Sequence, residues 1–316
     1  MQNGRYAAQV SGIGRRLPAL RLTNDEIAAH TDITAEWIQG RSGVETRHHA
    51  GDDEPIVQLA ADAALAALED AGLAPVDIDA VIVATTTLNR PMPGAAAAVA
   101  SLMGCGPVGA FDINAACAGF AYAVAVAADL VRGGTARHVV VVGAERLSDW
   151  TAPQTPDTFA ILGDGAGAAV VSVSAEDGIS RAVWGSDGTR ADLIAIPAWT
   201  DTVQMRGPLV YKWATTTMPD LAREVCAQAG LQLGDLDWLV LHQANIRIID
   251  GVAADLGVPA DRVARDVVDR GNTSAASIPL ALAALRADGR SKPGQKALLL
   301  GFGAGLTYAG LVIRLP

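Results

Sequence analysis

Residues 71–87 read Ala71-Gly-Leu-Ala-Pro-Val-Asp-Ile-Asp-Ala-Val-Ile-Val-Ala-Thr-Thr-Thr87, and a related stretch returns in the second half of the chain. The second stretch reads Ala229-Gly-Leu-Gln-Leu-Gly-Asp-Leu-Asp-Trp-Leu-Val-Leu-His-Gln-Ala-Asn245 and aligns with the first without a gap. In each, a segment with helical character leads through Ala-Gly-Leu and an Asp-x-Asp pair to an apolar, strand-like run. Self-similarity of this kind is typical of a repeated structural unit. The chain is therefore predicted to contain two copies of one unit.

The similarity between the two halves continues beyond these stretches. An Ala-rich helix predicted from Cys117 leads to the apolar strand 138–143, and a comparable helix precedes the strand 296–301. Strands that are apolar on both faces and alternate with helices indicate a layered α/β fold. We predict an N-terminal half over residues 1–172 and a C-terminal half over residues 173–316.

The composition is that of a globular protein that is not exported. Half of the 316 residues are apolar and 18% are charged, which is enough for a large core or for two fused domains. The N-terminal region has no signal-peptide run, and no later window reaches the ~18 apolar residues of a membrane span. The formal net charge of −10 disfavours nonspecific nucleic-acid binding. We predict a cytoplasmic protein with neither a membrane nor a nucleic-acid partner.

The chain has three cysteines, Cys105, Cys117 and Cys226. They show no paired spacing and no surrounding histidine cluster, so neither a disulfide framework nor a structural metal site is expected. The thiols are predicted to be reduced.

Three polar residues that are distant in the sequence are each expected at a strand-to-helix turn: Cys117, His242 and Asn272. A nucleophilic thiol, an imidazole and a carboxamide together indicate an acyl-transfer site. Taken singly, Cys117 fits a buried inert thiol better, because free cysteine packs as a small hydrophobe; together the three residues reverse that preference. His242 and Asn272, taken singly, fit satisfied polar groups at strand ends.

Two glycine-rich segments, 163–167 and 301–305, occupy equivalent places in the two halves. The first lacks the Lys-Ser/Thr of a phosphate loop and leads into a strand, so we predict a tight turn that serves backbone packing. The second has the same structural interpretation. It also has a functional one, because backbone N–H groups in such a turn can face a developing oxyanion.

Taken together, these segments resemble the thiolase superfamily, and specifically β-ketoacyl-acyl carrier protein synthase III. The resemblance covers essentially all of the chain. It rests on six motifs in order: Trp37-Ile-x-x-Arg41-Ser-Gly-Val-x-x-Arg47, Ala115-Ala-Cys-Ala-Gly-Phe120, Gly163-Asp-Gly-Ala-Gly167, His242-Gln-Ala-Asn245, Gly271-Asn-Thr-Ser-Ala-Ala-Ser-Ile-Pro279 and Gly301-Phe-Gly-Ala-Gly305.

The resemblance implies a thiolase-like five-layer αβαβα fold, a homodimer and a two-step condensation without a cofactor. The Cys117 thiolate, with its pKa lowered by a helix N-terminus, would take an acyl group from acyl-coenzyme A or an acyl carrier protein. A malonyl thioester, expected on acyl carrier protein, would then lose carbon dioxide and attack the acyl-enzyme. His242 and Asn272 would donate hydrogen bonds to the developing enolate.

Further residues of the site also come from the resemblance. The backbone N–H groups of Cys117 and Ala304 would hold the tetrahedral oxyanion, and Phe302 would border the site and keep it dry. Degradative thiolases carry a second catalytic cysteine near the C-terminus, whereas no cysteine follows Cys226 here. Condensation is therefore favoured.

The resemblance implies that Trp37, Arg41 and Asn245 bind acyl-coenzyme A or its pantetheine arm. An arginine that helps bind coenzyme A in related enzymes is missing from residues 153–158, and the usual Gly-Asn reads Gly207-Pro208. The carrier of the primer, coenzyme A or a carrier protein, therefore stays open. These departures favour a specialised polyketide-type pathway over fatty-acid initiation.

Arg206, Lys212 and Arg247 match positions that contact the acidic carrier protein, although a solvated surface is the alternative interpretation. Some relatives have a basic pair further along the helix that is predicted to carry Arg247, and here Ala254-Asp255 replaces it. Met92 matches a residue that closes the acyl pocket of the partner subunit, and its flexibility suits primers longer than acetyl.

Two other functions stay open from the sequence. Cys117 could pass its acyl group to an alcohol or amine, but this leaves the intact Asn272 without a purpose. A non-catalytic partner in a larger synthase would be expected to have lost Cys117, His242 or Asn272, and all three are present.

Overall fold

The computed structural model describes residues 6–316 and contains two sheets with related topology. The first has the order β1-β7-β6-β4-β5 and the second the order β11-β12-β13-β8. In each sheet two parallel strands, β4 and β6 or β11 and β12, are followed by an antiparallel strand. The bounds are β1 Ala7–Arg16, β4 Ala80–Ala84, β5 Gly109–Ile113, β6 His138–Arg146, β7 Asp164–Ser174, β8 Val183–Ser186, β11 Trp238–Leu241, β12 Lys296–Gly303 and β13 Thr307–Arg314.

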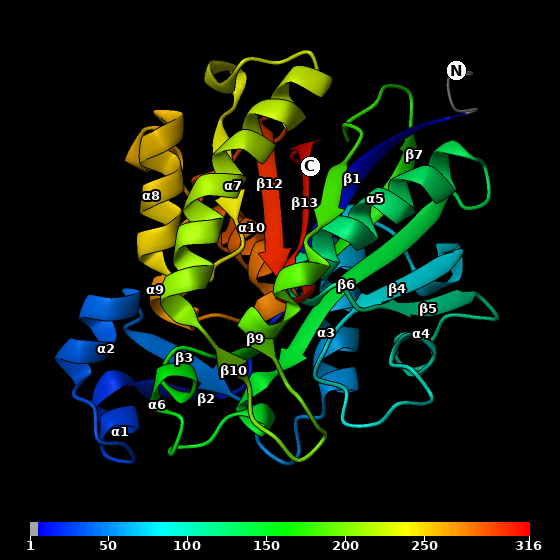
Figure 1. Cartoon of the computed structure of the whole chain (residues 1–316). Helices are drawn as coiled ribbons and strands as arrows, with labels where there is room; N and C mark the ends of the chain where they lie inside the picture. Colours follow the sequence, from blue (N-terminus) through cyan, green and yellow to red (C-terminus); the bar gives the residue numbers. More distant parts are fainter. Residues whose placement is uncertain (1–5) are drawn as a thin grey trace.

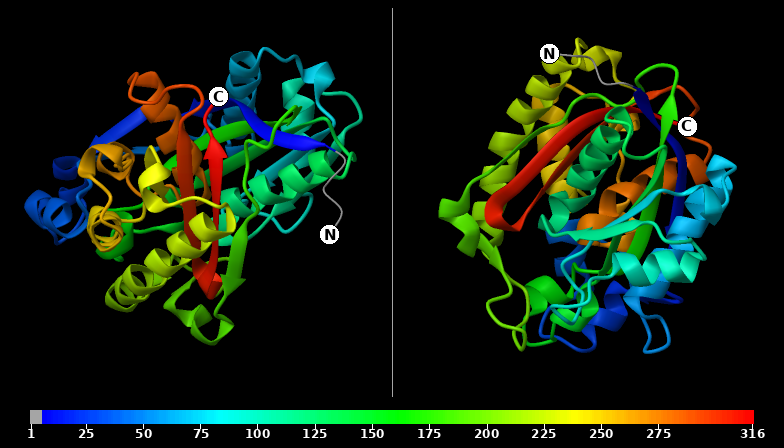
Figure 2. Two further views of the ribbon diagram at one scale, coloured as in Figure 1. Left: turned by 90° about the horizontal axis from the view of Figure 1, so that it is seen from above. Right: turned by 90° about the vertical axis from the view of Figure 1, so that its right-hand side faces the viewer.

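Helices form three layers around these sheets (Figure 1). Helices α3 (Ile56–Ala71) and α4 (Ala96–Met103) cover the outer face of the first sheet, and α7 (Gly207–Gln228) and α8 (Ile246–Leu256) cover the outer face of the second. Helices α5 (Gly119–Arg132) and α10 (Ser277–Ala287) lie between the sheets. The two turned views of Figure 2 show α5 beside the C-terminal strand β13. The fold is therefore the expected five-layer αβαβα arrangement.

Alternation along the strands explains the layers. In β4, Ile82 packs into the central core with α5, whereas Val81 and Val83 pack outwards against α3 and α4. In β12, Leu299 likewise packs into the central core, whereas Leu298 and Leu300 pack into the outer core with α7 and α8. Because successive strand residues point to opposite faces, a strand that is apolar at every position is buried on both sides.

The middle helices approach the strands closely, which requires glycine. A Cβ at Gly143 of β6 would lie 2.3 Å from the Ala275 carbonyl oxygen, and one at Gly301 of β12 would lie 2.9 Å from Ala118 Cα. Ala275 and Ala118 belong to the short 3₁₀ segments η7 (Ser274–Ala276) and η2 (Ala116–Ala118), which precede α10 and α5. Each half therefore presses its helix start against a strand of the other half.

A smaller unit sits beside the carboxyl ends of the central strands. It contains β2 (Leu20–Thr23), α1 (Asn24–Ala28), α2 (Ala35–Ser42) and β3 (Thr46–His49). The other short elements are α6 Pro156–Phe159, β9 Ile194–Ala195, β10 Gln204–Met205 and α9 Val267–Arg270. Arg47 of β3 is fully buried and donates hydrogen bonds to the Asn24 side chain and the Ala160 carbonyl oxygen, at 2.7 and 2.6 Å. This guanidinium ties the unit to the segment that follows α6.

Three local expectations were wrong in detail. Residues 163–167 do not form a tight turn, because β7 begins at Asp164; the packing role of the glycines holds, since a Cβ at Gly167 would lie 2.8 Å from the Leu280 nitrogen. In the second segment β12 likewise extends to Gly303. Asn272 follows the short helix α9 rather than a strand.

The expected boundary at residue 172 falls inside β7, two residues before that strand ends, and as a domain boundary it stays a prediction. In the part of the chain that the structure describes, no helix is long and apolar enough to cross a membrane. The same residues contain no cluster of three or more side chains suited to holding a metal ion.

Candidate active site

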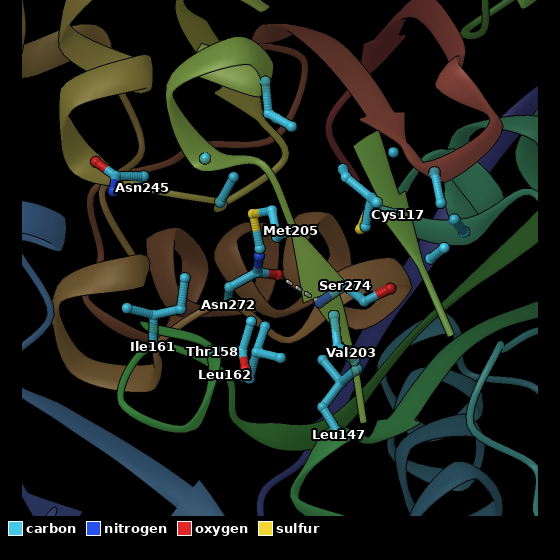
Figure 3. A pocket seen from close by; sticks show the side chains of 18 of the residues that line it. Cys117, Leu147, Thr158, Ile161, Leu162, Val203, Met205, Asn245, Asn272 and Ser274 are labelled. Atoms are coloured by element: carbon cyan, nitrogen blue, oxygen red, sulfur yellow. Dashed lines mark hydrogen bonds between the residues drawn. The ribbon is translucent and has the colours of Figure 1, made fainter. Parts of the chain in front are cut away.

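One cavity of about 970 Å³ lies where the two halves meet, at the ends of β11 and β12 and beside η2 and η7. Its lining includes Cys117, His242 and Asn272, so the structure brings together the three residues that the sequence singled out (Figure 3). The other predicted site residues that line it are Phe302, Ala304, Trp37, Arg41, Asn245, Arg206 and Arg247. Lys212 and Met92 lie outside the lining.

Cys117 is the second residue of η2, directly before α5. The preceding Ala116 has a φ of 46°, a left-handed conformation that alanine rarely adopts. Gly303 passes so close that a Cβ there would lie 2.6 Å from the Cys117 nitrogen. Amides in the first turn of a helix lack intrahelical acceptors, so this position leaves the Cys117 N–H available to a ligand.

The thiol environment differs from expectation. The sequence predicted a pKa lowered by the helix N-terminus, whereas burial raises the pKa of Cys117 to about 12. The nearby Ser274 side chain lowers this pKa, and the Glu145 carboxylate adds to the rise. Burial in this site therefore favours the neutral thiol.

His242 follows β11, and a serine hydroxyl occupies one of its ring nitrogens. Its Nδ1 lies 2.7 Å from Ser277 Oγ, and that oxygen also accepts the Gln243 backbone N–H at 3.2 Å. The hydroxyl can donate to Nδ1 and still accept from Gln243, an arrangement that places the imidazole hydrogen on Nε2. Burial lowers the pKa of His242 to about 3. The ring is therefore neutral, and it packs edge-on to Phe302 with centroids 5.1 Å apart.

The carboxamide of Asn272 is oriented by its own loop. Its Oδ1 accepts the Ser274 backbone N–H at 2.9 Å, as the dashed line in Figure 3 marks. Ser274 reaches this position with a φ of 47°. The backbone of Asn272 is held on both sides, because its N–H donates to the Ile161 carbonyl oxygen and its carbonyl accepts the Gly163 N–H. With Oδ1 occupied, the Nδ2 hydrogens of Asn272 are the groups left for a ligand.

Phe302 and Ala304 close the cavity from β12. The Phe302 side chain is buried between His242 and Trp213. Ala304 opens the short segment η8 (Ala304–Leu306), where a first-turn amide again lacks an intrahelical acceptor. Two such amides, at Cys117 and Ala304, therefore border one cavity.

Trp37 and Arg41 lie on α2 at the cavity wall, with the guanidinium carbon 5.5 Å from the indole centroid. Asn245 lies nearby, but both ends of its side chain are occupied. Its Nδ2 donates to the Arg41 carbonyl oxygen at 3.0 Å, and its Oδ1 accepts the Arg247 N–H at 2.8 Å. In this structure Asn245 therefore caps α8 and tethers it to α2.

The predicted basic residues surround the same mouth. Arg206 pairs with Asp192 at 3.2 Å on the surface, and the Arg247 guanidinium lies 5.8 Å from the ring centroid of Tyr211. Lys212 follows Tyr211 on α7 and is exposed. Exposed ion pairs contribute little stability, so these side chains are available for a partner.

One arm of the cavity was not predicted from the sequence. It is lined by apolar side chains from separate segments, including Leu147, Ile161, Leu162, Val203 and Met205 (Figure 3). These residues carry no motif, and only their convergence in space makes them a wall. Met92, predicted to serve the partner's pocket, is 79% exposed in the loop before α4.

Comparison with known proteins agrees with this geometry. Two family models match: 3-oxoacyl-[acyl-carrier-protein] synthase III over residues 111–188, and the C-terminal model of the same enzyme over residues 226–315. The chain is 46% identical over 312 residues to β-ketoacyl-[acyl-carrier-protein] synthase III 2 of Streptomyces avermitilis, covering 98% of this chain and 99% of that protein. It is 42% identical to the mycobacterial β-ketoacyl-[acyl-carrier-protein] synthase III of Mycobacterium tuberculosis, covering 99% and 97%.

Solved structures give the same result. The priming β-ketosynthase from the R1128 polyketide biosynthetic pathway superposes with a TM-score of 0.96 at 41% identity, covering 100% of this chain and 98% of that one. The 3-oxoacyl-(acyl carrier protein) synthase III of Pseudomonas aeruginosa superposes with a TM-score of 0.94 at 41% identity, covering 98% of each chain. The chain therefore belongs to the β-ketoacyl-acyl carrier protein synthase III family of thiolase-fold condensing enzymes.

Proposed function

We propose that the protein condenses an acyl primer with a malonyl thioester by way of an acyl-Cys117 intermediate. The observation that carries this proposal is that the His242 imidazole and the Asn272 carboxamide, each held by a hydrogen bond to one of its polar atoms, line the same cavity as the thiol. A pair of hydrogen-bond donors stabilises an oxygen that becomes negative during reaction.

In the first half-reaction the Cys117 sulfur attacks the thioester carbonyl of the primer and the carrier thiol departs. The oxyanion of the tetrahedral intermediate is held by the backbone N–H groups of Cys117 and Ala304. The apolar arm formed by Leu147, Leu162 and Val203 receives the acyl chain. Burial of the hydrocarbon contributes about 0.8 kcal/mol per methylene group.

In the second half-reaction a malonyl thioester loses carbon dioxide, and the resulting carbanion attacks acyl-Cys117. His242 and Asn272 donate to the thioester oxygen as it becomes an enolate. A histidine whose pKa is lowered to about 3 stays neutral at physiological pH, so it stabilises the enolate by donation rather than by protonating it. Donors that act only on developing charge raise the rate of the chemical step.

We propose that coenzyme A or acyl carrier protein presents the primer and that acyl carrier protein presents the malonyl group. Trp37 and Arg41 offer a stacking surface and a planar cation to the nucleotide end of coenzyme A. The basic residues Arg206, Lys212 and Arg247 suit an acidic carrier protein. The thioesters are substrates, and the proposed chemistry requires no further cofactor.

We propose a homodimer built on the edge strand β5, which pairs only with β4 on one side. Phe111 of this strand is 41% exposed, and Met92 projects from a neighbouring loop. An exposed edge strand with apolar side chains is a template for pairing with a second chain. In such a dimer Met92 would reach the acyl cavity of the partner subunit.

Cytoplasmic location is proposed from the same chemistry, since all three cysteines are free and a catalytic thiol requires a reducing compartment. The pathway is proposed to be of the polyketide-priming type. The missing coenzyme-binding arginine and the Gly207-Pro208 sequence favour it over fatty-acid initiation.

Intact-protein mass spectrometry tests the proposal directly. The protein is incubated with a panel of acyl-coenzyme A and acyl-carrier-protein thioesters, and malonyl-carrier protein is then added. We expect an acyl adduct on Cys117 that disappears as a β-ketoacyl carrier forms. An adduct that persists with malonyl-carrier protein and clears with small alcohols or amines would establish the alternative acyltransferase.

A further inference from the structure

The motif His242-Gln-Ala-Asn245 contains a polar side chain that the proposed chemistry does not use. Gln243 is 1% exposed, and it does not line the cavity, whereas the residues on either side of it do. A buried carboxamide needs hydrogen-bond partners inside the protein for both its oxygen and its nitrogen. The partners of Gln243 therefore identify the segments that this side chain connects.

The amide nitrogen of Gln243 continues the pairing between β11 and the segment beside it. Leu239 of β11 forms a single parallel bridge with Val263, and its carbonyl oxygen accepts the Ala264 N–H at 3.0 Å. Beyond this bridge, Gln243 Nε2 donates to the Leu241 carbonyl oxygen at 2.7 Å and to the Ala264 carbonyl oxygen at 3.4 Å. The side chain thus joins the end of β11 to its neighbour at the point where backbone pairing has stopped.

The amide oxygen of Gln243 caps α9. Val267, the first residue of this helix, donates its N–H to Gln243 Oε1 at 3.1 Å, whereas the preceding Asp266 makes no side-chain cap hydrogen bond. The N–H groups of a first helical turn lack intrahelical acceptors, so Gln243 satisfies a donor that α9 leaves unpaired. Because Nε2 faces carbonyl oxygens and Oε1 faces an N–H, these contacts determine the orientation of the amide.

The single turn of α9 carries this restraint to Asn272. Gly271 closes the turn, since its N–H donates to the Val267 carbonyl oxygen at 3.0 Å. A Cβ at Gly271 would lie 2.6 Å from the Ile161 carbonyl oxygen, and the same oxygen accepts the Asn272 N–H at 2.8 Å. One hydrogen bond and one tightly packed turn therefore separate the Gln243 amide from the backbone of Asn272.

The backbone of Gln243 is joined to the residue that holds His242. Its N–H donates to Ser277 Oγ at 3.2 Å, and this oxygen also lies 2.7 Å from His242 Nδ1. Ser277 is the first residue of α10. Gln243 is thus connected on one side to the support of the imidazole and on the other to the helix that precedes Asn272.

We propose that Gln243 is a positioning residue that sets the Asn272 carboxamide relative to the His242 ring. This inference deepens the proposed function and rests on it for the malonyl half-reaction, in which both side chains donate to one thioester oxygen. Preorganised donors are effective because they need no reorganisation during the reaction, and a misplacement of about 1 Å lowers a rate by about 10²-fold. None of the hydrogen bonds of Gln243 described above involves η2, which carries Cys117. The acylation step should therefore not depend on Gln243.

The test compares the two half-reactions in full-length Gln243→Met, a variant that keeps the length of the side chain and removes its hydrogen-bonding groups. Acylation of Cys117 is followed by intact mass, and decarboxylation by the release of labelled carbon dioxide from malonyl-carrier protein. We expect decarboxylation to slow by about 10- to 100-fold while acylation stays within about twofold of the parent. The loss should lie in kcat, with the KM for malonyl-carrier protein changed by less than about twofold.

Gln295→Met is the matched control. Gln295 is half-buried at the opposite end of β11, where its Oε1 accepts the Trp238 indole N–H at 3.0 Å and the Lys292 N–H at 2.8 Å. Its replacement also removes several hydrogen bonds, but these do not lead to Asn272. The ratio of decarboxylation to acylation should therefore equal that of the parent. A similar fall of this ratio in both variants would mean that Gln243 contributes only general stability, and it would overturn the proposal.

A double variant tests whether Gln243 acts through Asn272. Without the carboxamide there is no second donor to place, so addition of Gln243→Met to Asn272→Ala should slow decarboxylation by less than about threefold further. Independent action would multiply the two losses. A further loss of about tenfold or more in the double variant contradicts the inference.

Hydrogen exchange measured by mass spectrometry tests the structural link without catalysis. In Gln243→Met the amides of residues 267–272 should exchange at least about tenfold faster than in the parent, whereas Gln295→Met should leave them unchanged. If the parent forms no condensation product but this exchange responds, the condensation proposal fails and the link from Gln243 to Asn272 stands.

The opposite result is equally distinct. If the parent condenses while Gln243→Met keeps the parental exchange or the parental ratio of rates, the positioning proposal fails and condensation stands. Where Gln243→Met does not fold, as judged by circular dichroism, Gln243→Asn decides by the same ratio, because its shorter side chain cannot reach the partners on both segments at once.

Discussion

At the scale of single residues, each catalytic candidate is oriented by a neighbour within its own hydrogen-bonded loop. Ser277 holds Nδ1 of His242, and Ser274 fixes the orientation of the Asn272 amide. Burial alone would make these polar groups costly. Their hydrogen bonds offset that cost and orient both side chains, which leaves His242 Nε2 and Asn272 Nδ2 for a ligand.

Removal of individual side chains should separate the two half-reactions. Cys117→Ser should abolish acyl-enzyme formation, whereas Asn272→Ala should leave acylation intact and slow malonyl decarboxylation by about 10²–10³-fold, the usual effect of losing one oxyanion donor. His242→Ala should resemble Asn272→Ala. Release of labelled carbon dioxide and the intact mass measure the two steps, and full-rate condensation by Asn272→Ala would contradict the assignment.

The glycine beneath the nucleophile gives a second prediction. Gly303→Ala places a methyl group 2.6 Å from the Cys117 nitrogen, so it should displace the thiol and cost about 1–3 kcal/mol of unfolding free energy. Gly234→Ala is the matched control, because nothing lies within 4 Å of its Cβ position. Urea unfolding and acylation rates measure both effects, and equal behaviour of the two variants would show that this contact is relaxed at no cost.

The lowered pKa of His242 has a consequence for stability. Between its folded pKa of about 3 and the unfolded value near 6.5, the unfolded state binds one more proton than the folded state. His242 should therefore destabilise the fold as pH falls through that window, by up to about 1.4 kcal/mol per pH unit. The unfolding free energy of the parent minus that of His242→Gln should rise with pH there. A difference that stays flat would mean that His242 titrates normally.

At the scale of elements, the two halves contain the same strand–helix unit, but their sheets differ at one edge. The first sheet has a fifth strand, β5, beside β4, whereas the corresponding edge of β11 has only a single bridge between Leu239 and Val263. The first half therefore presents an additional edge strand that the second half lacks. This asymmetry supports β5 as the dimer strand.

A charge on β5 should weaken that interface. Phe111→Glu puts a carboxylate where an apolar side chain is 41% exposed, and burying an unpaired charge in an interface is strongly unfavourable. We expect a shift from dimer towards monomer in analytical ultracentrifugation. Leu20→Glu on β2, also an exposed apolar side chain, is the control and should leave the assembly unchanged. Equal assembly of both variants would place the interface elsewhere.

At the scale of the whole molecule, the cavity exists only because the two halves meet. Cys117 comes from the first half, while His242, Asn272 and Phe302 come from the second. The central layer of α5 and α10 holds the two sheets in a fixed relation through one continuous apolar core. Residues far apart in sequence thus share one site with little freedom to move.

The apolar arm of this cavity should set the length of the primer. Val203→Phe fills part of the arm, so short primers should still acylate Cys117 while longer ones lose about 10- to 100-fold in rate, as expected for a few displaced methylene groups. Val203→Ala should widen the tolerance in the opposite direction. Acylation rates across a series of acyl-coenzyme A chain lengths measure this preference. An unchanged length profile in both variants would show that the acyl chain of the primer lies elsewhere.

The sequence by itself determined the layered α/β class, the duplication and the three candidate residues Cys117, His242 and Asn272. Those features are local or repeated, so periodicity and motif spacing preserve them. Only the tertiary structure decided the thiol pKa, the hydrogen-bond partner of His242, the carboxylate of Glu145 behind Ser274 and the apolar arm. Each of these depends on groups that are distant in sequence and meet in a buried place, where desolvation and hydrogen-bond geometry set the energies.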